Sequence, residues 1–221
     1  MRATTSLRNA LFIPAKDMLT HSKGFPALVR QKSKEMPFDD TLMDIIDKAL
    51  VPVNDNIPDI ALEIIPILER ITGGKVEVEN SEFYILRNGK KIKFSTEAEG
   101  IKKIGLLWRL LMNESINKDT VLFWDEPEAN INPRIIPSLV EIILELSRRG
   151  VQVFIATHDY IFAKYVEVKM KEDDNVLFHS LHHTDNGVKC ETESRFSFLD
   201  NNSILKELVN LYEEEVEKVL G

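Results

Sequence analysis

The stretch VLFWDEPEANINP, residues 121–133, decides how this chain folds. Its first four residues are apolar and predict a buried strand, which ends at two adjacent carboxylates, Asp125 and Glu126. Pro127 prevents the strand from continuing, because proline lacks a backbone N–H and has a fixed φ. Asn132 and Pro133 are typical of the N-cap and first position of a helix. Two acids are therefore expected at the carboxyl end of a buried strand, where open α/β sheets bind their ligands.

The two acids can have different roles. Successive side chains of a strand point to opposite faces, so Asp125 and Glu126 face differently unless a turn intervenes. Asp125 can hold a hydrated Mg²⁺, an ion that prefers one or two carboxylates together with phosphate oxygens. Glu126 can orient or deprotonate a water for attack on phosphorus. For the acid pair taken alone, an acidic turn without chemistry is the alternative interpretation.

A second motif of the same design follows, VQVFIATHD at residues 151–159. The segment between the motifs, 133–149, has apolar residues at helical spacing, and Gly150 fits the position just after a helix. Strand, helix and strand in this order predict two parallel neighbouring strands. His158 is then expected one strand away from Glu126 at the same sheet edge, within reach of a γ-phosphate or the attacking water. A surface histidine at a strand end is the alternative.

The two motifs resemble those of a known class of enzymes. LFWDEPEANINP (122–133) resembles the Walker B strand, catalytic glutamate and D-loop of ABC-class ATPases, and FIATHD (154–159) resembles their switch-histidine strand. The nearest group is the AAA-family ATPases related to OLD, RecF and SMC heads. The resemblance implies ATP and Mg²⁺ as cofactors, with Asp125 on the magnesium side and Glu126 as the general base.

The same resemblance implies roles for three further residues. His158 matches the switch histidine of these ATPases. Residues 129–132 match the D-loop, so Asn130 and Asn132 are expected at the interface of a head-to-head homodimer that ATP closes.

A third segment, FSTEAEGIKKIGLLWR at residues 94–109, stands where the family has its signature motif. A strand, a polar turn and a helix are expected here, with one apolar helix face. In the family this helix points its N-terminus at the nucleotide of the partner subunit. Gly100 matches the signature glycine, whereas Ala98 stands where a serine is usual. The γ-phosphate then lacks a hydroxyl donor unless Ser95 or Thr96 supplies one, and an ordinary helix start is the alternative.

A Walker A motif is missing from the sequence. The motif needs GxxxxGK followed by Ser or Thr, so that backbone amides cradle the phosphates and the lysine reaches them. Gly74-Lys75 and Gly89-Lys90 lack both the leading glycine and the hydroxyl residue, and fit a β-hairpin instead. The chain is therefore expected to begin in mid-domain. The P-loop lobe would come from an N-terminal part or a partner chain, and the isolated chain would be inactive.

The composition is that of a globular domain with 221 residues, 43% apolar and 29% charged. A formal charge of −8 gives no overall basic footprint, so nucleic-acid binding is possible but is not indicated by charge. The single cysteine, Cys190, excludes an internal disulfide framework and favours the reducing cytoplasm. No apolar run approaches the length of a membrane span, so no membrane contact is expected.

A single partial ATPase domain is expected over residues 1–221, in four sections. Residues 15–74 form a basic loop (15–37) and a helical insert, with helices at 41–50 and 58–72. The second of these helices is capped by Asn56, kinked at Pro66 and ended by Gly73-Gly74. Residues 75–94 form a β-hairpin that turns at Asn88-Gly89.

The remaining two sections carry the motifs and the C-terminal part. Residues 95–165 hold the signature, Walker B, D-loop and switch-histidine core, which ends in a short helix at 160–165. Residues 166–221 form an antiparallel edge, turning at residues 185–187, and a C-terminal helix at 203–220 that packs through its apolar face. His179, His182 and His183 lack a nearby Cys or acid at ligand spacing, so a metal site there is not favoured.

The sequence thus predicts an α/β, P-loop NTPase-like (ABC-class) C-terminal lobe, with a largely parallel sheet, a helical insert and an antiparallel C-terminal edge. The first functional hypothesis is an ATPase whose nucleotide site is completed elsewhere. The second is a catalytically inactive regulatory or dimerisation module. A Toprim nuclease, as in OLD proteins, is not favoured because no acidic cluster follows in a further domain.

Overall fold

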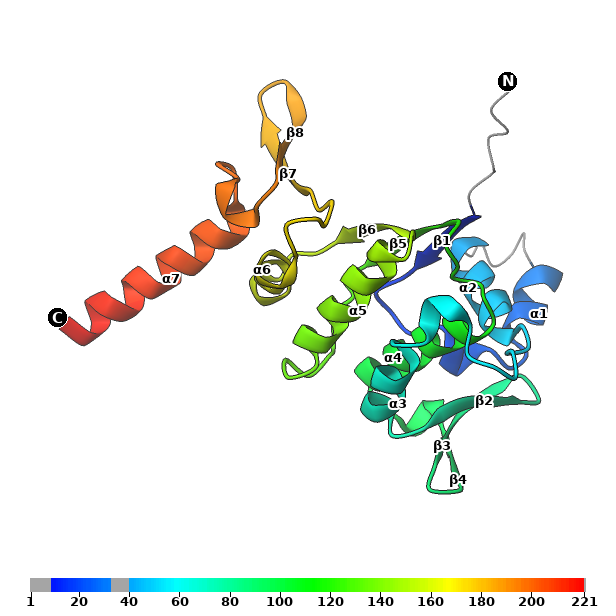
Figure 1. Cartoon of the computed structure of the whole chain (residues 1–221). Coiled ribbons are helices and arrows are strands. Elements are labelled where there is room, and N and C mark those ends of the chain that lie inside the picture. The colour runs from blue at the N-terminus through cyan, green and yellow to red at the C-terminus, as the bar shows by residue number, and fades with distance from the viewer. Residues whose placement is uncertain (1–8, 33–39, 221) are drawn as a thin grey trace. The chain divides into compact units, whose positions relative to one another are not determined.

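The computed structural model describes residues 9–32 and 40–220 (Figure 1). The chain divides into two compact units, residues 1–156 and residues 157–221. Each unit is described by itself.

The first unit is built on a parallel sheet of three strands in the order β1-β5-β6. These are β1 (Asn9–Ile13), β5 (Thr120–Asp125) and β6 (Gln152–Ala156), and both pairings are parallel. Asp125, at the end of β5, pairs with Ala156. The parallel strands predicted from the two motifs are therefore confirmed, and so is the α/β fold class.

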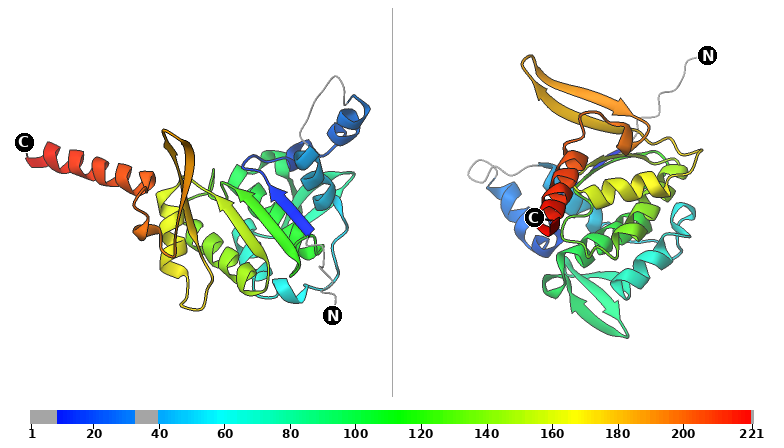
Figure 2. Two further views of the ribbon diagram at one scale, coloured as in Figure 1. Left: turned by 90° about the horizontal axis from the view of Figure 1, so that it is seen from above. Right: turned by 90° about the vertical axis from the view of Figure 1, so that its left-hand side faces the viewer.

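Only one face of this sheet is well covered. Alternate residues such as Leu11, Leu122 and Trp124 are almost fully buried. On the opposite face the register places Phe12, Phe123 and Phe154 in one row, and the last two are 42% and 45% exposed. The rings of Phe123 and Phe154 stack with centroids 5.0 Å apart. In the left view of Figure 2 the three strands lie in front of the helices of the first unit. Parallel sheets are ordinarily covered on both faces, so this open aromatic face is unusual.

Helix α4 (Glu99–Met112) is the central helix of the first unit and packs against α2 (Asp40–Leu50), α3 (Ile65–Thr72) and β2 (Lys75–Glu79). The sequence indicated one apolar face, but every residue from 102 to 112 is buried. The buried guanidinium of Arg109 is satisfied by backbone carbonyl oxygens. Its Nε donates to the Ala49 carbonyl at 3.0 Å, and its Nη2 donates to the Val51 carbonyl at 2.6 Å. Burial lowers the pKa of Arg109 to about 10.

The helical insert differs from the sequence prediction in two places. The expected basic loop contains a 3₁₀ turn, Leu19–His21, and helix α1 (Phe25–Gln31), while its residues 33–37 lie outside the described part of the chain. The single helix expected over 58–72 is divided into a 3₁₀ turn, Asp59–Ala61, and α3. Pro66 lies in the first turn of α3, where its missing N–H costs no hydrogen bond, so it starts a helix instead of kinking one.

The expected hairpin is an antiparallel sheet of β2, β3 (Glu82–Arg87) and β4 (Lys90–Lys93). Asn88 and Gly89 have φ values of 49° and 75°, which confirms the predicted turn with two left-handed residues. The sequence did not single out the first turn, Asn80-Ser81, where φ is 51° and 62°.

Helix α5 (Ile136–Arg148) connects β5 to β6 and starts later than predicted. The side chain of Asn132 accepts a hydrogen bond of 3.0 Å from the Arg134 N–H, and so closes a turn before the helix. Pro137, not Pro133, lies in the first helical turn. Gly150 has a φ of 99°, as its predicted place after the helix requires.

The second unit contains α6 (Tyr160–Lys169), β7 (Phe178–Thr184), β8 (Gly187–Glu193) and α7 (Ser203–Leu220). The strands form the predicted antiparallel pair, as a two-stranded sheet of their own. A small core of Ala163, Phe196 and Leu199 holds the unit together. The packing predicted for α7 is wrong for most of its length, because none of its residues is buried.

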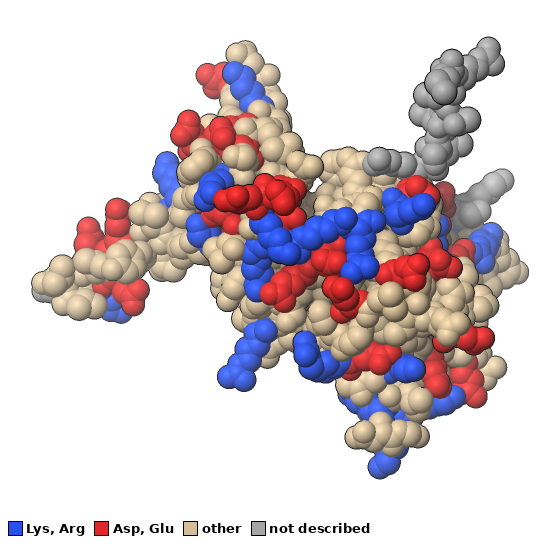
Figure 3. Space-filling view, in the orientation of Figure 1, with Lys and Arg blue, Asp and Glu red and all other residues tan. Residues whose placement is uncertain are grey.

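Charged side chains of both signs are interspersed on the face of the molecule shown in Figure 3. Within the described ranges, no helix is long and apolar enough to cross a membrane.

Candidate functional site

The candidate site lies at the carboxyl end of β5, where the chain leaves the sheet. Asp125 is half-exposed and, by alternation, belongs to the same face as Phe123. Glu126 ends the alternation, because its φ is 43° and its backbone is left-handed. That conformation costs a non-glycine residue about 1–2 kcal/mol. The Glu126 N–H still donates to the carbonyl of Ala156, at 2.9 Å, so the strained residue remains tied to the neighbouring strand.

The residues predicted to form the D-loop make a tight turn after Glu126. The Ala129 N–H donates to the Glu126 carbonyl at 3.1 Å, and the Ile131 N–H donates to the Glu128 carbonyl at 3.0 Å. Asn130 has a φ of 61° and is the second left-handed residue of the turn. Two such residues so close together mark a segment whose shape is imposed by its surroundings.

Lys103 of α4 supplies part of that constraint. Its ammonium donates to the Glu126 carbonyl at 2.7 Å and to the Ala129 carbonyl at 3.0 Å, and the residue is 7% exposed. Burial lowers the pKa of Lys103, although the carboxylates of Glu128, Glu126 and Asp125 act in the opposite direction. Sequence reasoning missed this residue. The available signal was a pair of lysines inside an otherwise apolar helix, since buried lysines need partners.

Gly100 touches the same turn through the backbone. A Cβ at this position would lie 2.7 Å from the Asn130 carbonyl oxygen and 3.0 Å from Ile131 Cα. Glycine at position 100 therefore has a packing reason inside this chain, in addition to the role that the family resemblance implies. The sequence predicted Gly100 and Asn130 separately, and the structure brings them into contact.

Ala98 is the N-cap residue of α4 and offers no side-chain cap. Its carbonyl accepts from the N–H groups of Ile101 and Lys102, at 2.9 and 3.1 Å. The hydroxyl of Thr96 donates to the Lys93 carbonyl at 2.8 Å, so in this structure it is engaged within the chain.

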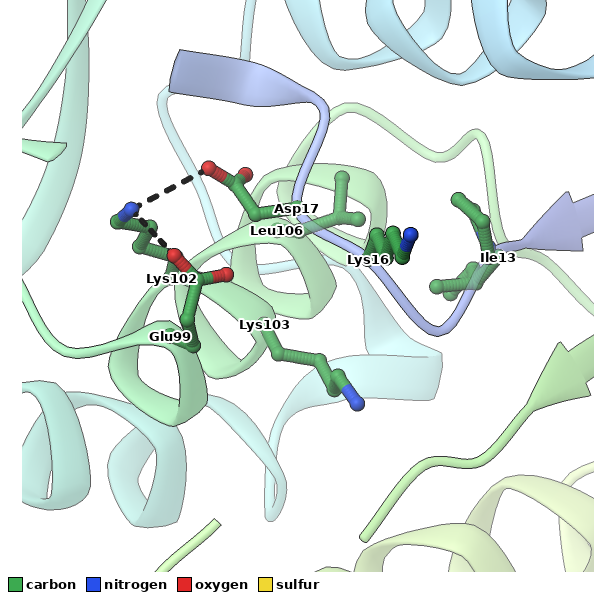
Figure 4. Close-up of a pocket in the computed structure, with 8 residues that line it drawn as sticks. Ile13, Lys16, Asp17, Glu99, Lys102, Lys103 and Leu106 are labelled. Atoms are coloured by element: carbon green, nitrogen blue, oxygen red, sulfur yellow. Dashed lines mark hydrogen bonds and ion pairs between the residues drawn. The ribbon is translucent and has the colours of Figure 1, made fainter. Parts of the chain in front are cut away.

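The neighbouring lysine, Lys102, has different partners. Its ammonium lies 2.8 Å from Glu99 and 3.5 Å from Asp17, beside a small pocket at the end of β1. Burial alone would lower the pKa of Lys102, but the two carboxylates outweigh it and raise that pKa. Figure 4 shows Lys102 and Lys103 leaving the helix in different directions, so only Lys103 serves the turn.

His158 lies two residues after β6, in the connection to α6, and belongs to the second unit. The adjacent Asp159 caps α6 by accepting from the Phe162 N–H at 2.6 Å. The expected position of His158 beside Glu126 stays a prediction. Asn132 belongs to the first unit but uses its side chain in the turn before α5.

The described residues contain no group of three or more His, Cys, Asp or Glu side chains that could hold a metal ion. Asp125 offers a carboxylate at the end of β5, and one carboxylate fits Mg²⁺ when phosphates supply further oxygens. His179, of the histidine group in β7, shares a 2.8 Å hydrogen bond with Thr192.

Residues 8–163 match the model of the family described as "AAA domain, putative AbiEii toxin, Type IV TA system". The chain belongs to this AAA-domain family. The match spans β1, α4, the Glu126 turn and β6, and it confirms the resemblance drawn from the motifs.

Among curated proteins, the chain is similar to the energy-coupling factor transporter ATP-binding protein EcfA of Methanothermobacter thermautotrophicus. The two are 27% identical over 156 residues, which cover 69% of this chain and 44% of that protein. The chain thus spans less than half the length of this curated relative.

Two solved structures are similar to part of this chain at low identity. One is the Smc head domain of Pyrococcus furiosus bound to the C-terminal domain of ScpA. The TM-score is 0.44 at 13% identity, and the match covers 70% of this chain and 37% of that chain. The other comes from work on ATP-driven dimerisation of SMC ATPases, with a TM-score of 0.44, 12% identity, and 70% and 96% covered.

Proposed function

We propose that this chain carries the hydrolytic half of an ATP site in an ATPase of the ABC/SMC type. The observation that carries the proposal is the Glu126 turn: a carboxylate residue directly after a parallel strand, fixed in a left-handed conformation by β6 and α4. Such strain is a mark of functional positions. Membership of the AAA-domain family and the similarity to an ATP-binding protein support ATP as the ligand of this site.

In the proposed reaction Glu126 is the general base. It takes a proton from water, the water oxygen bonds to the γ-phosphorus, and the bond to the β-phosphate oxygen breaks to leave ADP and phosphate. Asp125 would hold Mg²⁺ through a water, which would neutralise charge on the phosphates. His158 would hydrogen-bond the γ-phosphate or the attacking water. Two copies would meet head to head, with Gly100, Asn130 and Asn132 facing the nucleotide interface.

The phosphate cradle would come from a P-loop part outside these 221 residues, an N-terminal lobe or a partner chain, because no Walker A motif occurs within them. The open aromatic face of the parallel sheet supports this, since Asp125 belongs to the same face as Phe123 and Phe154. A lobe that brings phosphates to Asp125 would cover these rings and complete the second apolar layer that a parallel sheet needs. The single cysteine supports the cytoplasm as the compartment.

One observation favours a second function, a regulatory or dimerisation module without turnover. Ala98 caps α4 with its backbone alone, and the Thr96 hydroxyl is engaged with Lys93. Unless Ser95 supplies a hydroxyl, a γ-phosphate approaching this helix would meet one hydroxyl donor fewer than in relatives with serine at this position.

Steady-state phosphate release and nucleotide affinity of the protein completed with its P-loop part would test the proposal. Glu126→Gln should retain binding and lower turnover by about 10²-fold or more, because the size is kept and the base is lost. Asp125→Asn should also weaken Mg-ATP binding, and His158→Ala should lower turnover with little change in affinity.

Two controls make the result specific. Glu141→Gln, an exposed acid on α5, should behave like the wild type. The isolated chain should bind Mg-ATP only in the millimolar range in calorimetry, because it lacks the cradle of amides. If Glu126→Gln turns over ATP like the wild type, Glu126 is a structural turn residue and the regulatory function is favoured.

A further inference from the structure

Helix α4 holds the Glu126 turn at two positions on one face. Gly100 packs directly on the backbone of Asn130 and Ile131, and Lys103 reaches the carbonyls of Glu126 and Ala129. Residues three apart in a helix lie on the same side, so these two contacts form one continuous attachment. It extends from the first turn of α4 to the residue proposed as the base.

The bonds from Lys103 are well suited to fixing a backbone. Hydrogen bonds from a charged donor are about twice as strong as those between neutral groups. Lys103 as a residue is 7% exposed, so water has little access to these bonds. One of these carbonyls belongs to Glu126 itself, and the other precedes Asn130, so Lys103 holds the chain at both left-handed residues.

We propose that Lys103 is a positioning residue that makes the backbone geometry of Glu126 depend on the position of α4. It donates to the turn and touches no reacting atom. Because Gly100 and Lys103 lie on one rigid helix, a displacement at the N-terminus of α4 moves the Glu126 and Ala129 carbonyls with it. Binding of a phosphate at that N-terminus would thus be transmitted to the base. This last step rests on the proposed ATPase function, whereas the attachment itself does not.

Amide hydrogen exchange of the full chain tests the attachment directly. Lys103→Met keeps the length of the side chain and removes its donors, so exchange at Ala129 and Ile131 should rise by about tenfold or more, while α5 changes little. Lys103→Arg should restore most of the protection, because it keeps a charged donor. Lys102→Met is the matched control: it removes an equally buried lysine whose partners are Glu99 and Asp17, and should leave exchange in the turn unchanged. If Lys103→Met does not fold, Lys103→Gln provides the neutral side chain for the same measurement.

Unchanged exchange in the turn of Lys103→Met, or an equal rise in Lys102→Met, would overturn the proposal. So would a failure of Lys103→Arg to protect the turn better than Lys103→Met does.

Turnover in the protein completed with its P-loop part tests the catalytic consequence. Lys103→Met should lower kcat by about tenfold with KM and nucleotide affinity within about twofold of the wild type, because the base is displaced and the binding groups are not. A kcat equal to that of the wild type would overturn the link to catalysis. If the wild-type protein itself releases no phosphate, the proposed ATPase function fails while the hydrogen-exchange result still decides the role of Lys103 in the turn.

Discussion

Replacing Gly100 with alanine tests how closely α4 and the Glu126 turn are packed. The added Cβ would lie 2.7 Å from the Asn130 carbonyl oxygen, so the helix or the turn must move by about 0.7 Å to regain an ordinary contact of 3.4 Å. The atoms met first are backbone atoms, which cannot rotate away as a side-chain end can. Overpacking of this kind costs about 1–3 kcal/mol.

A second effect acts in the opposite direction. Alanine favours a helix over glycine by about 1 kcal/mol, and Gly100 is not in the left-handed region that would forbid alanine. The net expectation is a loss of about 0–2 kcal/mol in the free energy of unfolding, together with faster amide exchange at Ala129 and Ile131. Urea unfolding followed by the fluorescence of Trp108 and Trp124, both in the first unit, measures the first quantity.

Gly105→Ala is the matched control on the same helix. Its Cβ would meet Phe94 Cζ at 2.7 Å, a ring atom, with the next contact at 3.3 Å to a Val76 methyl. It adds the same helix propensity and lies away from the turn, so it should leave exchange at Ala129 and Ile131 unchanged. If Gly100→Ala instead raises the free energy of unfolding by about 1 kcal/mol, helix propensity alone accounts for the change in stability. The close packing of Gly100 on Asn130 is then wrong.

Two further predictions concern other parts of the chain. Burial alone would raise the pKa of Glu167, but hydrogen bonds from Lys164 and Ser197 outweigh it and lower that pKa. The ionised carboxylate therefore stabilises the folded second unit at pH values above the pKa that Glu167 has in the unfolded chain. This stability is lost as the pH falls through the lowered pKa of the folded state. Glu167→Gln should lower the free energy of unfolding by about 1–2 kcal/mol at neutral pH. It should also make unfolding, followed by circular dichroism, depend less on pH in the acid range, and an unaltered pH profile would contradict this role. Ser81→Gly should raise the free energy of unfolding by about 0.5–1 kcal/mol in urea titrations, because Ser81 has a φ of 62° that glycine adopts without strain. A loss of stability would show that the serine side chain matters more than its backbone conformation.

The sequence by itself determined the elements whose cause is local. The apolar runs before Asp125 and before Thr157 predicted two parallel strands, because a single helix connects them as a crossover. Asn88-Gly89 predicted a turn with two left-handed residues, and both φ values agree. Pro66 was misread because proline is compatible with both a kink and a first helical turn, and only the packing of the insert decides between them.

The Glu126 turn depends on contacts between residues far apart in the chain, and only the tertiary structure decided its geometry. The sequence gives no sign that Glu126 is left-handed, because this strain persists only where β6 and α4 hold both of its backbone groups. Lys103 joins the turn across 23 positions of sequence, and Gly100 meets Asn130 across a similar separation. Phe12, Phe123 and Phe154 read as three ordinary strand residues until the register sets them in one row on the open face of the sheet. Local pattern fixes which residues form strands and turns, whereas the geometry of the site comes from which distant residues are brought together.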